Sequence, residues 1–304
     1  MIPNYPQFSA LHLDHQKELE EFIQSFPPHS DYNLASLWSY DTDNAIQISM
    51  LHGNLVVIFR DYVTNEPVIS FLGNTRVDQT IQTLLSYAQT IHLSPAISLL
   101  AEDTIAAITS KSDYILTEDR DNFDYIVSTD EIVQMKGTKY LKKRTKIHAF
   151  EREYGSVIQP IFLDISQQAI QQSIMELFTH WETQQQRPPN ETHRERAAIE
   201  KIFLVRDKFS LHSLGLTIHN RLIGFAIDEV IHHGHGVTHF EKADLQFRGI
   251  YEYLKRHSAI HLQKLGCNYI NLEQDLGIEG LRAAKMAYRP VYFIKKYTVK
   301  PKIP

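Results

Sequence analysis

The order of strand-like and helix-like patterns in the second half of the sequence constrains the fold of this chain most strongly. Alternating and helical hydrophobic spacings follow one another from residue 157 to residue 299. They predict, in order, a strand at 157–164, helices at 165–181 and 191–205, a hairpin at 210–230, a strand at 234–244, a helix at 249–265, a strand at 267–273, a helix at 278–288 and a strand at 290–299. Antiparallel hairpins that lead into a strand–helix–strand crossover predict an α+β fold with a mixed, mostly antiparallel sheet flanked by helices.

The first half contains elements of the same kinds. The sequence predicts a helix at 14–26, a hairpin that turns at 52–54, a strand at 66–73 and a helix at 77–91. The hairpin of the second half is predicted to turn at Asn220 and Arg221. Because a single core rarely grows beyond about 250 residues, a chain of 304 residues favours two domains.

Composition limits the class of protein. Hydrophobic residues make up 43% of the chain and charged residues 22%, which is ordinary for a globular protein. No apolar run reaches the roughly 18 residues of a membrane span, and the first residues lack a signal-peptide pattern. We therefore expect a cytoplasmic protein without membrane insertion. Cys267 is the only cysteine, which excludes a disulfide framework and a cysteine-rich zinc site.

The turn before the helix predicted at 249–265 has the pattern of an anion site. It reads FEKADLQFRGIYEYL, and the residues at the turn are Gln246, Arg248, Gly249 and Tyr251. This Gln-x-x-Gly turn resembles that of the N-acyltransferase fold, where backbone N–H groups at a helix start hold the pyrophosphate of acyl coenzyme A. In that fold a small residue stands where this chain has Tyr251. The resemblance implies acyl coenzyme A as a donor, and the bulk of Tyr251 favours a smaller or differently placed ligand.

Three longer segments resemble one family. The segments KGTKYLKKRTKIHAFEREYG, HFEKADLQFRGIYEYL and YINLEQDLGIEGLRAAKMAYRP are similar to signature segments of soluble bacterial proteins related to the C-terminal domain of phosphatidylglycerol lysyltransferases. The resemblance implies two tandem N-acyltransferase-like (GNAT-like) domains, at 1–135 and 156–304, joined by a basic helix at 136–155. Lysyltransferases of this kind move an amino acid from aminoacyl-tRNA to a lipid head group. The resemblance therefore implies acyl or aminoacyl transfer to an amine or hydroxyl of a small-molecule acceptor, with the active cleft in the second domain.

A basic segment lies between the two predicted domains. Residues 136–152 hold seven basic residues and one acid, a net charge of +6, whereas the whole chain carries −5, which leaves −11 elsewhere. If 139–154 is helical, its aromatic and aliphatic residues form a stripe that faces the protein, and Lys143 and Arg144 fill a gap in that stripe. A buried cation needs a carboxylate or an anionic ligand. These two residues are therefore either interdomain ion pairs or a site for the donor's phosphate, with a tRNA acceptor end lying on 139–152.

The strands predicted at 234–244 and 267–273 carry the candidate cleft residues. Alternation predicts that Thr238 shares a face with Phe240, and that His239 shares the other face with Glu241. In the resembled fold these two strands splay apart, and the substrates meet in the gap. The side chains predicted to line this cleft are Glu241, Asn271 and Glu273.

Two residues are predicted to move protons. A partly desolvated carboxylate at a strand end can take a proton from an amine or hydroxyl, which makes Glu241 the candidate general base. Tyr288 is the candidate general acid, as tyrosines in this region are in several acyltransferases. The alternatives are structural: Glu241 would pair with Arg144 or Lys242, and Tyr288 would bury its hydroxyl on a backbone partner.

The loop and helix after residue 273 supply further cleft candidates, because the family match is densest there. They are Asp275, Arg282 and Lys285. Alternation would also align His233, His235 and His239 as metal ligands. That segment lies at a predicted hairpin tip with no acid close in sequence, so no metal site is predicted.

These patterns lead to two functional predictions. The first is a cytoplasmic acyl- or aminoacyltransferase whose donor is acyl coenzyme A or aminoacyl-tRNA. The second is a protein that keeps the fold, has lost the chemistry, and binds or senses a small ligand. Two departures from the resembled pattern motivate the second prediction: Tyr251 replaces a small residue, and Asp244 stands where the lysyltransferases have an arginine.

Overall fold

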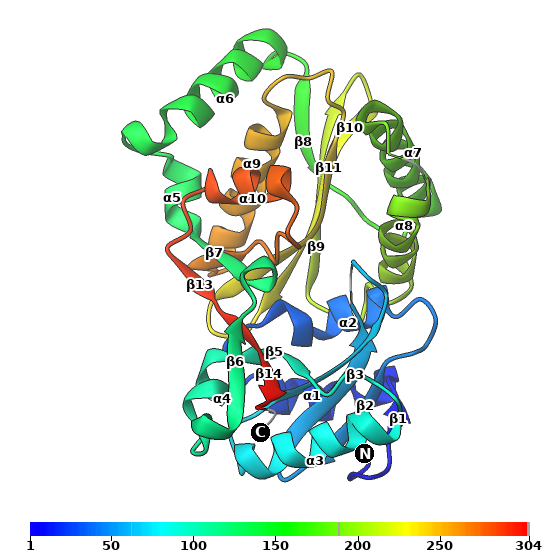
Figure 1. Ribbon diagram of the computed structural model, residues 1–304. Coiled ribbons are helices and arrows are strands. Elements are labelled where there is room, and N and C mark those ends of the chain that lie inside the picture. Colours follow the sequence, from blue (N-terminus) through cyan, green and yellow to red (C-terminus); the bar gives the residue numbers. More distant parts are fainter. Residues whose placement is uncertain (62, 188, 303–304) are drawn as a thin grey trace. The chain divides into compact units, whose positions relative to one another are not determined.

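The computed structural model describes residues 1–61, 63–187 and 189–302, and the chain forms two compact units (Figure 1). Unit 1 comprises Met1–Asp124, Gln274–Ala283 and Phe293–Pro304, and unit 2 comprises Tyr125–Glu273 and Ala284–Tyr292. The predicted boundaries of the tandem domains, 1–135, 136–155 and 156–304, remain a prediction, because a compact unit is a different division from a repeat of a fold.

Unit 1 is built on two sheets. The first has the antiparallel order β1-β2-β3-β4, with β1 at Ser9–Ala10, β2 at Gln47–Leu51, β3 at Asn54–Arg60 and β4 at Pro67–Leu72. The second has the order β5-β14-β6, with β5 at Ile97–Ala101, β6 at Tyr114–Glu118 and β14 at Lys296–Pro301. The β2–β3 hairpin turns at His52 and Gly53, as predicted. Both have positive φ, 53° and 82°, which matches the turn to the twist of the strands.

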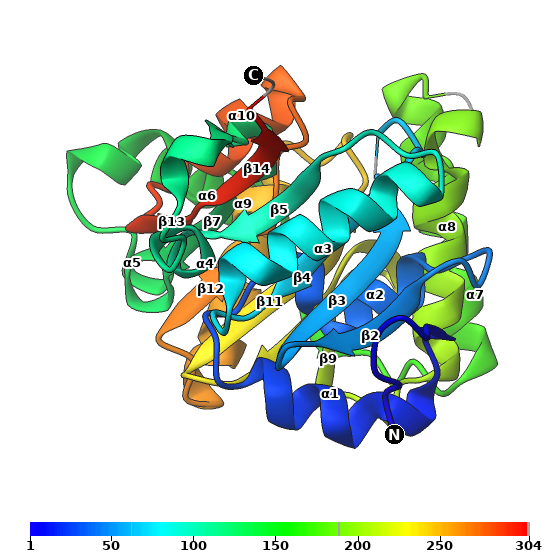
Figure 2. The ribbon, with the colours of Figure 1, turned by 60° about the horizontal axis from the view of Figure 1, so that its bottom comes forward.

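Helices complete unit 1. They are α1 at Gln16–Ile23, preceded by a 3-10 turn at Leu13–His15, α2 at Leu34–Tyr40, α3 at Val77–Thr90 and α4 at Glu102–Ala106. The predictions of helices at 14–26 and 77–91 are therefore confirmed. Helix α3 crosses the strands of the unit, and residues spaced three or four apart on one of its faces are buried in the core (Figure 2).

Unit 2 is organised around a seven-stranded sheet with the order β13-β7-β12-β11-β10-β9-β8. Its strands are β7 at Asp124–Ser128, β8 at Ile158–Phe162, β9 at Leu211–Ile218, β10 at Arg221–Ile231, β11 at His235–Ala243, β12 at Tyr269–Asn271 and β13 at Tyr292–Ile294. Strands β11 and β12 are parallel, and the pairs β8–β9, β9–β10, β10–β11 and β12–β7 are antiparallel. The mixed, mostly antiparallel sheet is as predicted.

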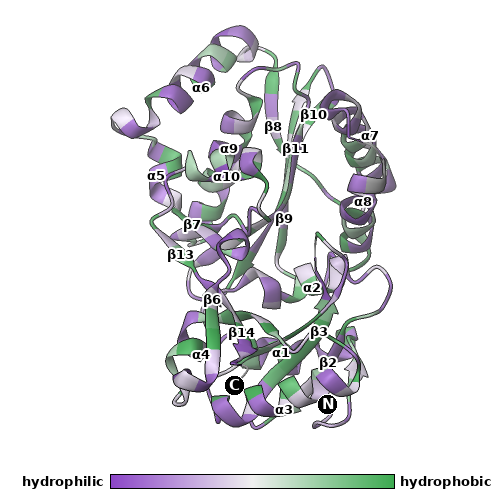
Figure 3. Cartoon of the chain, viewed as in Figure 1, coloured by the Kyte–Doolittle hydropathy of each residue, from purple (hydrophilic) through white to green (hydrophobic). Residues whose placement is uncertain are grey.

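Helices cover both faces of this sheet. They are α5 at Thr129–Gln134, α6 at Leu141–Tyr154, α7 at Gln168–Gln185, α8 at Pro189–Leu204 and α9 at Ile250–Lys264, and α10 at Glu279–Met286 starts in unit 1 and ends in unit 2. Helix α9 lies on one face, and α7 and α8 lie on the other (Figure 1). Hydrophobic residues mark the central strands, while hydrophilic residues mark much of the outer surface of α7 (Figure 3).

Two details of the predicted strands are wrong. The β9–β10 hairpin turns at His219 and Asn220, with φ of 49° and 62°, and Arg221 already pairs with Ile218. The turn needs two residues with positive φ, which asparagine tolerates well. The single strand predicted at 290–299 is two strands in different sheets, β13 and β14, because the apolar pattern of that segment continues across the point where it changes sheet.

Among the residues that the structure describes, no helix combines the length and the apolarity needed to cross a membrane.

Candidate functional site

The candidate site in unit 2 begins where β11 and β12 separate. The parallel pairing ends at Val237 and Asn271, whereas β11 continues to Ala243. The edge of β11 after Val237 therefore has no pairing with β12. The backbone N–H of Ala243 donates to the Tyr251 hydroxyl at 3.3 Å, which shows that this N–H faces away from β10. Since residues two apart in a strand point their backbone groups to the same side, the N–H of Glu241 faces the same open edge.

A β-bulge corrects the predicted alternation of β11. Ile227 pairs with Phe240, and the next residue of β10, Asp228, pairs with Thr238, so His239 is an extra residue in the register of β11 against β10. An extra residue reverses the alternation beyond it. Thr238 and Glu241 consequently lie within reach of one side chain, Lys255 of α9. The predicted pairing of Thr238 with Phe240 on one face, against His239 with Glu241, is wrong for this reason.

Glu241 is held in a tight ion pair. Its Oε2 lies 2.5 Å from the Nζ of Lys255, and only 16% of the Glu241 side chain is exposed. The same Nζ donates to Thr238 Oγ1 at 3.2 Å. The alternative partners, Arg144 and Lys242, are engaged elsewhere: Lys242 pairs with Glu195 at 2.6 Å. Lys255 is thus the residue that sequence reasoning missed.

A sequence signal for Lys255 exists on helix α9. Tyr251, Lys255, Ser258 and Leu262 recur at the spacing of one helical face, and the last three are buried. A lysine in a stripe that ends in a buried serine and leucine requires a buried partner. The stripe alone does not identify that partner, because Glu241 comes from another element.

Tyr288 and Lys143 lie near enough to Glu241 for its charge to act on both. The Nζ of Lys143 is 3.4 Å from the centre of the Tyr288 ring, and both side chains are buried. Burial, followed by the charges of Glu241 and Glu252, raises the pKa of Tyr288 well above its usual value. Burial lowers the pKa of Lys143 to about 8. Tyr288 therefore stays protonated over the physiological range and can donate a proton, as a general acid must.

The direct ion pairs around these residues involve more lysines than carboxylates. Glu252 pairs with Lys146 at 2.7 Å and more distantly with Lys143 at 3.8 Å, and Glu241 pairs with Lys255. Three lysines thus share two carboxylates. Lys143 has the longest of these ion pairs although it is buried, which suits it to an anionic group of a substrate.

The turn at Gln246–Gly249 has a structural explanation. Gly249 has φ of +93°, and a Cβ on it would lie 2.6 Å from the carbonyl oxygen of Lys146 in α6. The glycine is therefore required where α6 packs against the start of α9. Gln246 and Arg248 are exposed, and the backbone N–H of Gln246 donates to Asp244 at 3.1 Å. Asp244 itself is buried and pairs with Arg221 at 2.6 Å.

Tyr251 occupies the open edge of β11. Its hydroxyl accepts hydrogen bonds from the backbone N–H of Ala243 and from Trp181. Burial, and then the charge of Glu241, raises the pKa of Tyr251. The carboxylate of Glu252 lies in the first turn of α9, where an anion of a ligand would otherwise be favoured. The carboxylate of Glu252 and the bulk of Tyr251 therefore disfavour the binding of a pyrophosphate at this helix start.

Arg144 caps a chain segment in the structure. Its Nη1 donates to the carbonyl oxygens of Met135 and, at 2.7 Å, of Gly137. Of the predicted apolar stripe, Tyr140, Ile147 and Phe150 are buried, and Tyr154 is half-buried. The role of Arg144 as a phosphate ligand stays a prediction.

Asn271 and Glu273 make contacts of a different kind from those of Glu241. Asn271 is buried, and its Oδ1 accepts from the backbone N–H of Glu273 at 2.7 Å. The imidazole of His239 lies 3.0 Å from Glu229 and 3.3 Å from Glu273. Burial lowers the pKa of His239, but the hydrogen bonds and charges of these two glutamates outweigh it and raise that pKa to about 10. That all three predicted residues line one cleft remains a prediction.

The remaining predicted cleft residues divide between the units. Asp275 is buried in unit 1 and pairs with Arg282 at 2.8 Å and with Arg120 at 3.3 Å. Arg282 also pairs with Asp121 at 2.5 Å. This network fixes the loop before α10 within unit 1. Lys285 is half-buried and belongs to unit 2.

The histidines predicted to align have separate partners. His235 Nε2 shares a hydrogen bond with the Tyr292 hydroxyl at 2.7 Å, and the His235 ring stacks on Tyr269. His239 lies between its two glutamates. In the described part of the chain, no group of three or more side chains has the arrangement of a metal site.

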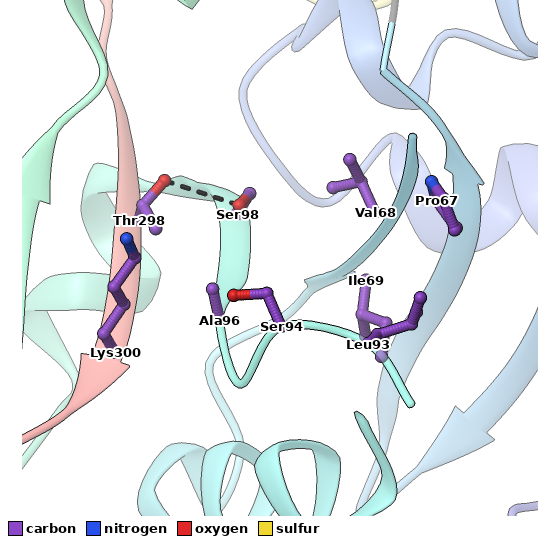
Figure 4. A pocket seen from close by; sticks show the side chains of 9 residues that line it. All are labelled: Pro67, Val68, Ile69, Leu93, Ser94, Ala96, Ser98, Thr298 and Lys300. Atoms are coloured by element: carbon purple, nitrogen blue, oxygen red, sulfur yellow. Dashed lines mark hydrogen bonds between the residues drawn. The ribbon is translucent and has the colours of Figure 1, made fainter. Parts of the chain in front are cut away.

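Unit 1 has a cavity of about 320 Å³. Its lining, drawn in Figure 4, consists of Pro67, Val68, Ile69, Leu93, Ser94, Ala96, Ser98, Thr298 and Lys300. One wall is apolar, and the other carries hydroxyl groups and the ammonium of Lys300. Lys300 is the one titratable group in this lining, so the cavity has no acid–base pair of the kind that unit 2 offers.

Similar proteins support an assignment to a family. The model of the phosphatidylglycerol lysyltransferase C-terminal domain matches residues 25–300. A protein of Mycoplasmoides gallisepticum, described as uncharacterised, is 24% identical over 194 residues, and the match covers 64% of this chain and 60% of that protein. The chain therefore aligns with less than two thirds of that relative's length.

Solved structures show the same fold. A conserved protein of unknown function from Bacteroides thetaiotaomicron superimposes with a TM-score of 0.83 and 25% identity, covering 99% of this chain and 100% of that one. The L-PGS structure from Bacillus licheniformis has a TM-score of 0.63 and 13% identity, with coverage of 100% and 95%. A tandem GNAT protein of the clavulanic acid pathway has a TM-score of 0.50 and 9% identity, with coverage of 98% and 99%. The chain therefore has a GNAT-like acyltransferase fold and belongs to the family of phosphatidylglycerol lysyltransferase C-terminal domains.

Proposed function

We propose that this protein is a cytoplasmic aminoacyltransferase that passes an amino acid from aminoacyl-tRNA to an amine or hydroxyl of a small molecule. The observation that supports the proposal is the cluster in unit 2: Lys143 lies against the Tyr288 ring, and the charge of Glu241 acts on both side chains. A carboxylate can act as the general base of acyl transfer, a tyrosine that stays protonated as its general acid, and a buried cation as the partner of an anionic substrate group.

The proposed reaction uses these groups in turn. The acceptor's nitrogen or oxygen attacks the carbonyl carbon of the aminoacyl ester, and Glu241 takes the acceptor's proton. The backbone N–H of Glu241, which faces the open edge, supports the developing oxyanion. The bond from the carbonyl carbon to the ribose oxygen then breaks, and Tyr288 gives its proton to that oxygen. A proton passes from Glu241 to Tyr288 to restore both groups.

The charges near the site favour aminoacyl-tRNA over acyl coenzyme A. The pyrophosphate position expected for coenzyme A has Glu252 in the first turn of α9 and Tyr251 across the edge of β11. In contrast, Lys136, Lys142 and Arg152 are exposed in the basic segment. Exposed cations on one segment suit a phosphate backbone, whose binding falls steeply with salt.

Transfer of a radiolabelled amino acid from charged tRNA to small molecules is the direct test. Glu241→Gln and Tyr288→Phe should each lower the rate by about 100-fold or more, as the loss of an acid–base group does. Glu195→Gln is the matched control, because Glu195 pairs with Lys242 and has no part in the proposed reaction. A Glu241→Gln variant with full activity would remove the base assignment.

Binding of tRNA is tested separately. Reversal of charge at Lys136 and Lys142 should weaken tRNA binding and reduce its dependence on salt. Lys264→Glu, which changes an exposed lysine of α9, serves as the control. Binding that does not depend on salt contradicts the tRNA proposal.

The second candidate is a protein that binds a small ligand without catalysis. The ion pair between Glu241 and Lys255 favours it, because this pair occupies the proposed base in the ligand-free chain. Stabilisation by a small amine or carboxylate in a thermal-shift screen, without transfer from either donor, would support this candidate. Transfer activity that depends on Glu241 would exclude it.

A further inference from the structure

We propose that Lys255, Thr238 and Asp228 form a buried relay that balances charge when Glu241 gains or loses a proton. The inference rests on the proposed role of Glu241 as a base and names the residues that make that role electrostatically feasible. None of the three is assigned a role by the sequence patterns. They come from three different elements, α9, β11 and β10.

The contacts of the relay form a chain from Glu241 through Lys255 and Thr238 to Asp228. The Nζ of Lys255 lies 2.5 Å from Glu241 Oε2 and donates to Thr238 Oγ1 at 3.2 Å. Thr238 Oγ1 donates its own proton to Asp228 Oδ1 at 2.7 Å. Ser258 Oγ donates to the other oxygen, Asp228 Oδ2, at 2.5 Å. The hydroxyl of Thr238 therefore points its oxygen at the ammonium and its proton at the second carboxylate.

Because Lys255 is buried, its positive charge needs a negative charge nearby. Lys255 is 4% exposed, and Asp228 and Ser258 are 1% and 0% exposed. A cation in such a place is costly without a counterion. If Glu241 were its only partner, protonation of Glu241 would leave the cation unpaired. Asp228, acting through Thr238, keeps a second negative charge near Lys255, so Glu241 can become neutral.

The bulge at His239 makes the relay possible. Without the extra residue, Thr238 and Glu241 would point to opposite faces of β11, and one lysine could not contact both. The register of β11 against β10 places Asp228 directly opposite Thr238. A bulge beside a reactive group is a common way to redirect a side chain.

Other charged or titratable groups surround the relay. The groups that interact electrostatically with Glu241 are Lys143 of α6, Tyr251 of α9 and Tyr288 after α10. The groups that interact electrostatically with Asp228 are His212 of β9, His261 of α9 and Cys267 before β12. The charge of Lys255 also contributes to lowering the pKa of Lys143. The three relay residues differ from these neighbours in that direct contacts connect them to Glu241.

The test is a titration that needs no substrate. The protein is labelled with 13C at the side-chain carboxyl of glutamate, and the Glu241 signal is identified by its loss in Glu241→Gln. Lys255→Met removes the cation and should move the midpoint of the Glu241 titration up by about one to three pH units. Asp228→Asn should move it down, because Lys255 then depends on Glu241 alone.

Thr238→Val separates a relay from simple charge effects. This variant changes no charge but breaks the link from Lys255 to Asp228, so the midpoint should fall, by less than in Asp228→Asn. It also keeps the proposal testable if Asp228→Asn does not fold. Lys242→Met is the matched control, because Lys242 is also buried but pairs with Glu195; the midpoint should stay within about 0.3 units.

The outcomes separate this inference from the proposed function. An unchanged midpoint in Lys255→Met or Thr238→Val overturns the relay, whether or not the protein transfers amino acids. Shifted midpoints in a protein that transfers nothing support the relay and remove the transferase proposal. If transfer does occur, the acid side of its pH–rate profile should move in the same direction as the titration in each variant.

Discussion

Replacement of Gly249 by alanine tests why a glycine stands at the start of α9. Gly249 has φ of +93°, and an added Cβ would lie 2.6 Å from the carbonyl oxygen of Lys146. Ordinary contact begins at 3.4 Å, so the two groups would have to separate by about 0.8 Å. The oxygen belongs to the backbone of α6 and cannot rotate away. Relief of the contact therefore requires a shift of the helix.

The expected loss of stability has two parts. A residue with a Cβ in the left-handed region costs about 1 to 2 kcal/mol. The displacement of α6 costs about 1 to 3 kcal/mol more, as overpacking does elsewhere. Gly249→Ala should thus destabilise unit 2 by about 2 to 5 kcal/mol.

Another glycine isolates the backbone part. Gly266 has φ of +89°, with nothing within 4 Å of an added Cβ. Gly266→Ala should therefore cost about 1 to 2 kcal/mol. The difference between this variant and Gly249→Ala measures the contact with α6.

Urea unfolding followed by tryptophan fluorescence provides the assay. The chain has two tryptophans, Trp38 in unit 1 and Trp181 in unit 2, so a Trp38→Phe background reports on unit 2. If Gly249→Ala is no less stable than Gly266→Ala, the packing explanation is wrong. The glycine would then be better explained by the close approach of a ligand.

Two further predictions concern buried charges. Lys296 is fully buried between Asp31 and Asp124, so Lys296→Met should destabilise unit 1 by about 3 to 5 kcal/mol at pH 8. The loss should be smaller at pH 5 in urea unfolding, because burial raises the pKa of Asp31 to about 6; an equal loss at both pH values would contradict this. The pKa of His239 is raised to about 10, so its contribution to stability is complete below its unfolded value near 6.5 and is lost as pH rises toward 10. His239→Gln should flatten this fall in melting temperature between pH 7 and 10, and an unchanged fall would refute the assignment.

Local patterns in the sequence determined most of the secondary structure and the family. Hydrophobic periodicity located the longer helices of both units and the two hairpins, because burial of one face leaves a period that needs no knowledge of distant residues. The three quoted segments were sufficient for the family, which the match over residues 25–300 confirms. The apolar stripe of α6 was also visible, since Tyr140, Ile147 and Phe150 repeat at helical spacing.

Only the tertiary structure decided how the site is assembled. The bulge at His239 reverses the alternation that the sequence of β11 implies, because its position depends on the register with β10. That reversal brings Thr238 and Glu241 to Lys255, whose place in the stripe of α9 indicates a buried partner but does not identify it. Similarly, Gly249 looks like part of a phosphate loop until the carbonyl of Lys146 is seen against it. In each case the deciding contact joins residues of different elements, and a local pattern does not contain such contacts.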